Sequence, residues 1–380
     1  MLSVVFAIAL GLAQPAAATE DVVLPAELCR GFWLLPVEFE PGEDGQARTL
    51  WFLHDTGASR TVVDPDSIER LSGQRLEDDQ RITLTHARSG RLKINSLPGR
   101  VMELDHISIA LGRPVDGIMS VYALEDFLLI LDYPAEQMRL RAGELPRPDG
   151  RTVFSTRGPD GRPWLRTDLA GRERPLLIDS GGGGLTFAVN HIERFNLAAP
   201  PRILSSAVRF DRIERRPVAR LDGDAMVAGL RIEAPVLEEV PRSELLGGEI
   251  LRYFVVTLDQ ANRRVRMERA VEGPIAPLDH YATGAMLRPT AAGIEVLEVY
   301  EGAPMTEAGL APGDLITHFD GVPPAERGCT TAVSGASPGG APGSTAVTIR
   351  RGGVEQVLQV ETFPVLPAPP RWSEGAGRRP

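Results

Sequence analysis

One short pattern occurs twice in this sequence and constrains its fold more than any other feature. The first copy is an apolar run at residues 51–53 that leads into Asp55-Thr56-Gly57. In the second copy, residues 175–178 lead into Asp179-Ser180-Gly181. In each copy, the apolar run is typical of a buried strand that ends in a turn. Two strands that each deliver an aspartate into a turn predict two carboxylates that meet in one site.

The wider sequence around these copies also repeats. Residues 127–140 and residues 254–267 have the same pattern, an apolar run ending in aspartate and then a short run containing Arg between apolar residues. Both are typical of strand, turn and strand, and a hairpin is expected in the middle of each half. In the first half, residues 107–112 belong to a strand-like stretch, and a short helix is expected at residues 121–128. Internal self-similarity of this kind predicts two duplicated all-β lobes, at about residues 30–144 and 150–270.

Composition sets the broad class and excludes some partners. The chain has 380 residues, enough for two or three domains, and is 43% hydrophobic and 24% charged, which is ordinary for a globular protein. Its formal net charge is −10. Nucleic acids and anionic membranes attract basic surfaces, so neither is expected as a partner.

The two ends of the chain differ from its body. Residues 1–19 resemble a signal peptide, because an apolar stretch precedes Ala16-Ala17-Ala18, and that stretch is too short to span a bilayer. We therefore expect export to a bacterial periplasm or exterior, with no stable membrane insertion after cleavage. Residues 364–380 are rich in Pro, Gly and Arg and are expected to form a disordered tail.

A third segment, at about residues 276–362, has a pattern of its own. It contains Gly302-Ala-Pro, Ala308-Gly-Leu, Pro312-Gly-Asp and Asp320-Gly in that order. This run resembles a bacterial PDZ domain. The resemblance implies that the segment binds a peptide, such as a C-terminal peptide, as an added strand at a sheet edge. It also implies a carboxylate-binding loop near residues 284–287.

The two repeated segments resemble the lobes of a retropepsin-type aspartic protease. With the third segment, the chain is similar to bacterial aspartyl-protease family proteins that carry a C-terminal PDZ domain, over about residues 30–362. The resemblance implies that Asp55 and Asp179 form the catalytic dyad, that no cofactor is needed, and that the middle hairpins act as flaps. In such proteins the hydroxyl after each aspartate bonds to the loop of the other lobe, and the next glycine leaves room beside the carboxylates. The implied supporting residues are Thr56, Gly57, Ser180 and Gly181.

The chemistry of paired carboxyls suits peptide hydrolysis. Two carboxyls about 3 Å apart cannot both ionise, so one pKa rises and the pair holds a shared proton. The ionised member can take a proton from water while the protonated member donates to the scissile carbonyl. The sequence thus predicts an exported endopeptidase that acts on peptide or protein substrates.

Three departures from the family pattern bear on this prediction. Gly182–Gly184 stand where the first copy has Ala-Ser, so the second loop is expected to be looser. Ser120 stands where glycine is usual. His54 precedes Asp55 where an apolar residue is usual; alternation along a strand points it away from the dyad, and a hydrogen bond within its lobe is expected.

Two other functions stay open at this stage. A catalytically inactive pair of lobes would leave a peptide-binding or adaptor protein. Asp179-Ser180-Gly181 also resembles the nucleophile segment of trypsin-like serine proteases, some of which carry PDZ domains. That reading needs glycine before Asp179, where Ile178 stands, and a His–Asp pair earlier in the chain.

The cysteines and histidines give weaker signals. Cys29 and Cys329 fall in different predicted domains, so a disulfide is possible but two unpaired buried thiols are favoured. The histidines show no grouping with cysteines or acids at metal-ligand spacing, and no metal site is predicted.

Overall fold

The computed structural model describes residues 21–40, 48–184, 186–208, 213–330, 336–338 and 343–369. The expected signal peptide lies outside this range. Within it, strands far outnumber helices, and the predicted all-β class is confirmed. No helix in the described part of the chain is long and apolar enough to cross a bilayer.

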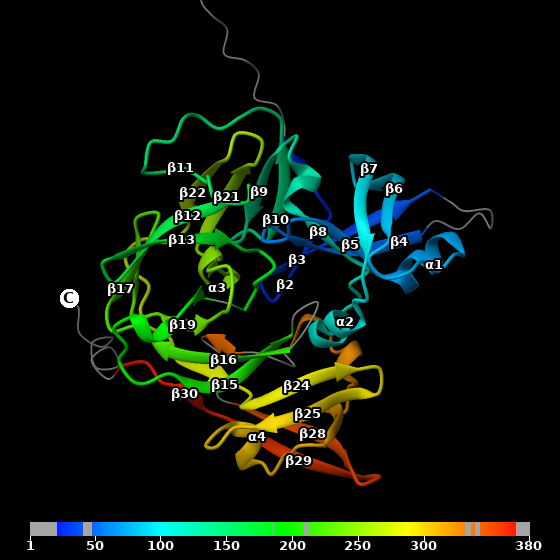
Figure 1. The fold of residues 1–380 in the computed structure, drawn as a ribbon, viewed down its shortest axis with the longest axis vertical. Coiled ribbons are helices and arrows are strands. Elements are labelled where there is room, and N and C mark those ends of the chain that lie inside the picture. The colour runs from blue at the N-terminus through cyan, green and yellow to red at the C-terminus, as the bar shows by residue number, and fades with distance from the viewer. Residues whose placement is uncertain are drawn as a thin grey trace, which may run out of the picture.

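The described strands form five sheets (Figure 1). The N-terminal sheet contains β2 (Glu27–Cys29), β3 (Phe32–Phe39), β4 (Arg48–Asp55), β5 (Thr61–Val63), β6 (Arg81–Ser89), β7 (Leu92–Val101) and β8 (Gly117–Ser120). The central sheet contains β12 (Trp164–Leu169), β13 (Arg172–Ile178), β14 (Phe187–Val189), β15 (Arg202–Val208), β16 (Ile213–Arg220), β17 (Asp224–Val227), β18 (Leu230–Glu233), β19 (Val236–Glu239) and β20 (Leu245–Leu246).

Three further sheets complete the fold. The shared sheet contains β1 (Val22–Val23), β9 (Leu128–Asp132), β10 (Gln137–Arg141), β11 (Val153–Ser155), β21 (Phe254–Asp259) and β22 (Arg264–Arg269). The C-terminal sheet contains β24 (Ala285–Thr290), β25 (Gly293–Val299), β26 (Leu315–Phe319), β28 (Gly343–Arg351) and β29 (Val354–Thr362). A small sheet contains β23 (His280–Ala282), β27 (Ala336–Pro338) and β30 (Pro364–Leu366).

The helices are short. The α-helices are α1 (Pro65–Ser72), α2 (Asp105–Leu111), α3 (Gly248–Leu251) and α4 (Pro304–Glu307), and the 3-10 turns are η1 (Val121–Leu124), η2 (Ile192–Arg194), η3 (Pro324–Glu326) and η4 (Gly328–Thr330). Helix α1 shows the sequence signals that set its ends: Asp64 caps its N-terminus, Pro65 follows, and Gly73 ends it with a φ of 73°.

One set of strand pairings occurs in both the N-terminal and the central sheet. In the N-terminal sheet, β4 is parallel to β8, β8 is antiparallel to β5, and β5 is parallel to β7. In the central sheet, β13, β20, β14 and β19 pair in the same way. Asp55 ends β4 and Asp179 follows β13 directly, so the two acids hold equivalent positions.

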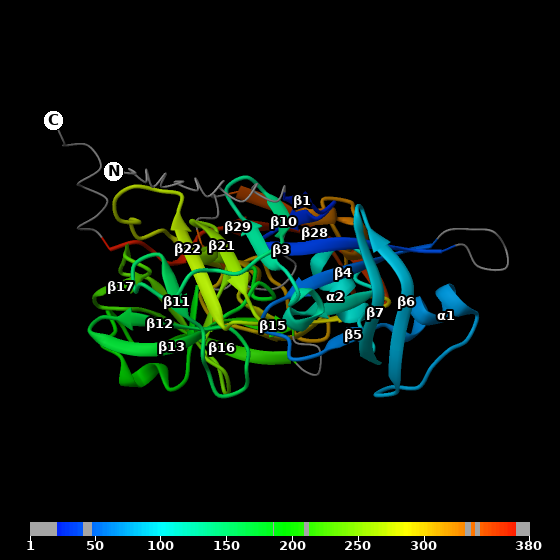
Figure 2. The same cartoon turned by 90° about the horizontal axis from the view of Figure 1, so that it is seen from above.

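The shared sheet joins these two halves through their repeated closing strands. Its order, β1-β10-β9-β21-β22-β11, places the matching strands of both repeats symmetrically about its centre. Figure 1 labels β9 beside β21, and Figure 2 shows β22, β21 and β10 from above. At that centre β9 and β21 are antiparallel, and Ile130 lies opposite Thr257, its equivalent in the other repeat. The register therefore has a local pseudo-two-fold axis, the arrangement of a self-complementary interface.

The hydrophobic core follows the same division. One large cluster of buried side chains is continuous across the N-terminal, central and shared sheets. The C-terminal sheet has a separate core. Strand β4 is fixed in the large core by Leu50 and Phe52, and the Phe52 ring fills the space beside Gly117, where a Cβ would lie 2.3 Å from it. Leu53, on the other face of β4, is buried in a second cluster, so the strand that ends at Asp55 is packed on both faces.

The structure differs from expectation at three places along the chain. Residues 107–111, part of a strand-like stretch, are helical in α2. The short helix expected at 121–128 is the 3-10 turn η1, and β9 begins at Leu128. The prediction of a disordered tail from residue 364 is wrong for β30, because Val365 and Leu366 are buried in a cluster with the central sheet.

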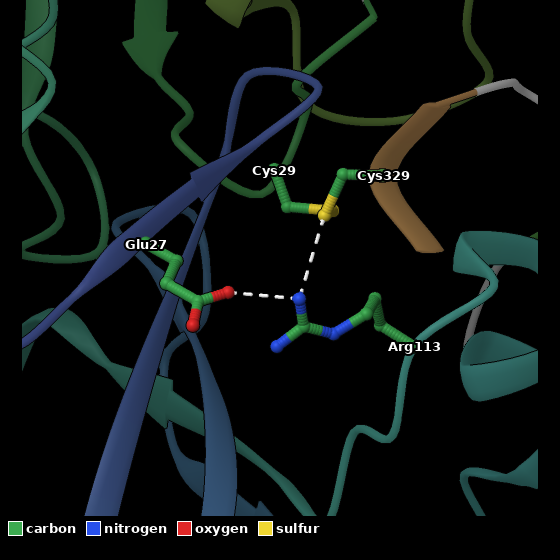
Figure 3. The surroundings of a disulfide bond; sticks show 4 residues. All are labelled: Glu27, Cys29, Arg113 and Cys329. Carbon is green, nitrogen blue, oxygen red and sulfur yellow. Dashed lines mark hydrogen bonds and ion pairs between the residues drawn. A yellow bond between two sulfur atoms is a disulfide. The ribbon is translucent and has the colours of Figure 1, made fainter. Parts of the chain in front are cut away.

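The expectation of unpaired thiols is also wrong, because Cys29 and Cys329 form a disulfide across a sequence separation of 300 (Figure 3). The bond ties β2 of the N-terminal sheet to η4, beyond the C-terminal core. The backbone explains the meeting: the N–H of Gly328 donates to the carbonyl of Gly112 at 2.8 Å, which brings η4 beside the N-terminal sheet. Arg113 lies next to the sulfur of Cys329 and forms an ion pair with Glu27 at 2.8 Å.

Candidate active site

Thr56 and Ser180 connect the two aspartate loops through four crossed hydrogen bonds. The Oγ1 of Thr56 accepts from the N–H of Ser180 at 2.9 Å and donates to the carbonyl of Ile178 at 2.7 Å. The Oγ of Ser180 accepts from the N–H of Thr56 at 3.0 Å and donates to the carbonyl of His54 at 2.9 Å. Both side chains are fully buried, so water does not compete for these bonds. The loops are therefore held at a fixed spacing.

The two carboxyls lie at the contact between these loops. The Oδ1 of Asp55 accepts from the N–H groups of Gly57 at 2.7 Å and Ala58 at 3.1 Å, and the Oδ1 of Asp179 accepts from Gly181 at 3.0 Å. A Cβ at Gly57 would lie 2.7 Å from the Oδ1 of Asp179, and one at Gly181 would lie 2.3 Å from the Cγ of Asp55. Each glycine is thus pressed against the carboxyl of the other loop. The structure brings all six predicted residues together.

The surroundings of the pair favour one bound proton. Burial, the charge of Asp179 and a hydrogen bond with the Asp179 carboxyl raise the pKa of Asp55 well above its usual range, against the opposing effect of the Gly57 and Ala58 N–H groups. Asp55 is partly buried and Asp179 is buried. Because the two acids titrate together, the proton belongs to the pair.

The raised pKa predicts how the dyad affects stability. A carboxyl whose pKa is raised on folding favours the folded state below its unfolded pKa and loses that contribution as the pH rises through the folded pKa. We therefore expect Asp55→Asn to match the wild type in stability near pH 3 and to exceed it at neutral pH, with a difference that grows by at most about 1.4 kcal/mol per pH unit. Denaturant unfolding across this pH range measures the difference in unfolding free energy. The contribution of the buried histidines is the same in both proteins and cancels. A constant difference at all pH values would contradict the expectation.

The crossed hydrogen bonds predict a cost for removing one hydroxyl. Thr56→Val keeps the side-chain shape but leaves the N–H of Ser180 and the carbonyl of Ile178 buried without partners, at about 1–3 kcal/mol for each group. The denaturation midpoint should fall accordingly, whereas Thr56→Ser, which keeps the hydroxyl, should stay close to the wild type. Equal midpoints for the Val and Ser variants would show that the hydroxyl does not hold the loops.

Two neighbouring side chains do not have the roles that were considered for them. Ser180 is fully buried, and among the described residues its Oγ bonds only to backbone groups, so it lacks the exposed, base-activated hydroxyl of a serine nucleophile. His54 is also fully buried, between Trp33 and Met119 on the neighbouring strands. Burial lowers its pKa to about 4. Neither ring nitrogen has a hydrogen-bond partner among the described residues, so the expected hydrogen bond within the lobe is wrong.

The first middle hairpin, β6–β7, does not extend over the dyad as a flap. Its base is nearest to the Asp55 loop, where Gly99 pairs with Thr61. Its tip turns back over β3, and the hydroxyl of Ser89 donates to the carbonyl of Pro36 at 2.7 Å. The second middle hairpin, β15–β16, forms as expected, but its tip at residues 209–212 lies outside the described residues.

In the described part of the chain, one group of acids has the spacing to hold a cation. The carboxylate oxygens of Asp64, Asp66 and Asp105 lie within 4.8 Å of one another. Asp64 already serves the backbone, because it accepts from the N–H groups of Ser67 at 3.1 Å and Leu104 at 3.0 Å. Asp64 is thus accounted for by its role as the N-cap of α1, and the group lies outside the two aspartate loops.

Sequence reasoning missed one residue of the site. Arg162 donates from its Nη1 to the carbonyl of Gly57 at 2.6 Å, in the loop that holds Asp55. No motif marks it, because it lies in the turn before β12, well before Asp179. Its position within the repeat is a signal that could have found it, because in each half the chain that enters the strand paired with the aspartate strand reaches the opposite loop.

Comparison with known proteins adds no family to this picture. No protein-family model matches the chain, and no curated protein matches it. The function of the chain is therefore inferred from the geometry of the site.

Proposed function

We propose that this chain is an aspartic-type endopeptidase that hydrolyses peptide bonds through Asp55 and Asp179. One observation carries the proposal: two carboxyls from equivalent loops lie against each other's glycine, and burial and mutual charge raise the pKa of Asp55. The crossed bonds of Thr56 and Ser180 support it, because they fix the spacing that a shared proton needs. A structural ion pair would join groups of opposite charge, whereas these two groups are both acids.

The proposed reaction uses the pair as both base and acid. The ionised carboxyl takes a proton from a water molecule, whose oxygen attacks the scissile carbonyl carbon. The protonated carboxyl donates to the carbonyl oxygen, and proton return to the leaving nitrogen completes the cleavage. General base and general acid catalysis each contribute roughly 10²–10⁴-fold. The reaction needs no cofactor.

The proposal includes the wider architecture. The N-terminal and central sheets would be the two protease lobes, and the C-terminal sheet would be a PDZ domain that binds a peptide or protein partner at a strand edge. Helix α2 packs against β24 at one end of that sheet. The Cys29–Cys329 disulfide supports export to an oxidising compartment such as a bacterial periplasm.

A peptide-cleavage assay with two inhibitors tests the proposal. Purified protein is incubated with a mixed peptide library between pH 3 and pH 7, with either a pepstatin-like statine inhibitor or a serine-directed phosphonate. We expect cleavage that the statine blocks and the phosphonate does not. Cleavage blocked by the phosphonate would favour a serine mechanism, and peptide binding without cleavage at any pH would favour the adaptor function.

A further inference from the structure

The side chain of Arg162 reaches from the central sheet to the loop that holds Asp55. Its Nη1 donates to the carbonyl of Gly57 at 2.6 Å, and only 17% of the side chain is exposed. Gly57 is the residue whose N–H holds the Asp55 carboxyl at 2.7 Å and whose α-carbon lies against Asp179. Arg162 therefore binds a peptide segment that touches both acids.

The guanidinium of Arg162 is itself held in one orientation. Its Nε donates to Asp160 at 2.8 Å and its Nη2 to the hydroxyl of Ser243 at 3.2 Å. Asp160 is fixed in turn, because it accepts from the indole N–H of Trp164 at 2.9 Å. A planar group with three directional partners has little freedom to move away from Gly57.

The pseudo-symmetry of the molecule provides a comparison for this contact. The N–H of Ile178, the residue before Asp179, donates to the carbonyl of Pro163, and His54, the residue before Asp55, pairs with Trp33. Pro163 and Trp33 are therefore equivalent positions, and Arg162 and Phe32 are the residues that precede them. Phe32 also reaches the opposite loop, where a Cβ at Gly183 would lie 2.7 Å from its ring. The Asp179 loop thus packs against an apolar ring, whereas the Asp55 loop is hydrogen-bonded to a cation.

We propose that Arg162 is a positioning residue that sets the geometry of the dyad through the carbonyl of Gly57. The catalytic consequence of this role rests on the proposed function. Without the bond, the Gly57 segment can move away from Asp179, and the separation of the carboxyls changes. Displacements of about 1 Å in an active site can cost on the order of 10²-fold in rate.

Variants at Arg162 separate geometry from charge. Arg162→Lys keeps the charge but cannot bond to Gly57, Asp160 and Ser243 at once. For Arg162→Ala we expect kcat to fall about 10- to 100-fold with KM changed by less than about threefold, and the alkaline limb of the pH profile to move; the Lys variant should recover only part of the loss. The matched control is Arg166→Ala. Arg166 is 77% exposed and paired with Glu173, and its replacement should leave kcat, KM and the pH profile unchanged.

Two outcomes would overturn the proposal. One is an Arg162→Ala variant whose kcat and pH profile stay within about twofold of the wild type. The other is a loss of kcat that matches a loss of folded protein, with the pH profile unmoved, since that describes a purely structural role.

A readout without turnover keeps this proposal separate from the protease proposal. If the wild type cleaves no peptide, the proposed function fails, but the stability difference between wild type and Asp55→Asn still reports how strongly the pair binds its proton. Measured again in the Arg162→Ala background, the pH at which that difference appears should shift. An unshifted pH would overturn the role of Arg162 independently of catalysis.

Discussion

Replacing either Asp55 or Asp179 with asparagine is expected to lower kcat for peptide hydrolysis by about 10³-fold or more. An amide cannot take a proton from water, and it cannot share one with the remaining carboxyl, so base and acid functions are lost together. The two single variants should be equally inactive, and the double variant should be little worse than either, because the pair acts as one unit. Initial rates on a peptide identified in the library assay measure the effect.

Three further variants show whether the loss is specific to the dyad. Asp126→Asn replaces an exposed acid outside the site and should keep wild-type activity. Ser180→Ala should keep activity within one or two orders of magnitude, because it weakens the crossed bonds but leaves both acids. Thr56→Ser should lie between the wild type and Ser180→Ala. Full activity in Asp55→Asn would refute the dyad, and complete loss in Ser180→Ala alone would return attention to a serine mechanism.

The disulfide predicts the second large effect. Cys329→Ser opens a covalent loop that spans 300 positions of sequence, and loss of a native disulfide typically costs about 2–4 kcal/mol. We expect the cost to fall on the attachment of η4 and the C-terminal sheet to β2. Hydrogen exchange should therefore rise mainly at residues 324–330 and in α2, which packs against η3. Denaturant unfolding followed by fluorescence gives the free-energy change.

A reductant serves as the internal control for this prediction. Dithiothreitol should lower the unfolding midpoint of the wild type to that of Cys329→Ser and leave the variant unchanged. The ion pair between Arg113 and Glu27 stays in both, so it does not contribute to the difference. A wild type whose midpoint does not respond to reductant under conditions that titrate two free thiols would contradict the prediction.

Sequence patterns predicted the parts of the fold that local periodicity determines. The strands that lead to Asp55 and Asp179 and the repeated strands β9–β10 and β21–β22 are short apolar runs bounded by turn residues, and they form where expected. Helix α2 shows where this fails. Its isoleucines alternate as in a strand, but Ile107 and Leu111 pack into one core while Ile109 packs against the C-terminal core. Tertiary packing on both sides overrides local preference there.

The candidate site likewise contains residues that the sequence predicts and residues that only the fold brings together. The six residues at 55–57 and 179–181 could be predicted because each motif is contiguous and its residues act where they stand in the chain. Cys29 with Cys329 and Arg162 with Gly57 could not be, because each pair meets only through the folding of segments far apart. The hydrogen bond expected for His54 was wrong, because alternation predicts the direction of a side chain but not whether a hydrogen-bond partner lies there.

The symmetric register of β9 and β21 has a consequence for how the site is assembled. Two separate molecules joined by such strands would dissociate on dilution. Here both halves belong to one polypeptide, so the pairing of the two acids does not depend on protein concentration. A molecule built from identical copies must also repeat every substitution. In one continuous chain each half can be substituted independently. Phe32 and Arg162, which stand at equivalent positions of the two halves, are an example.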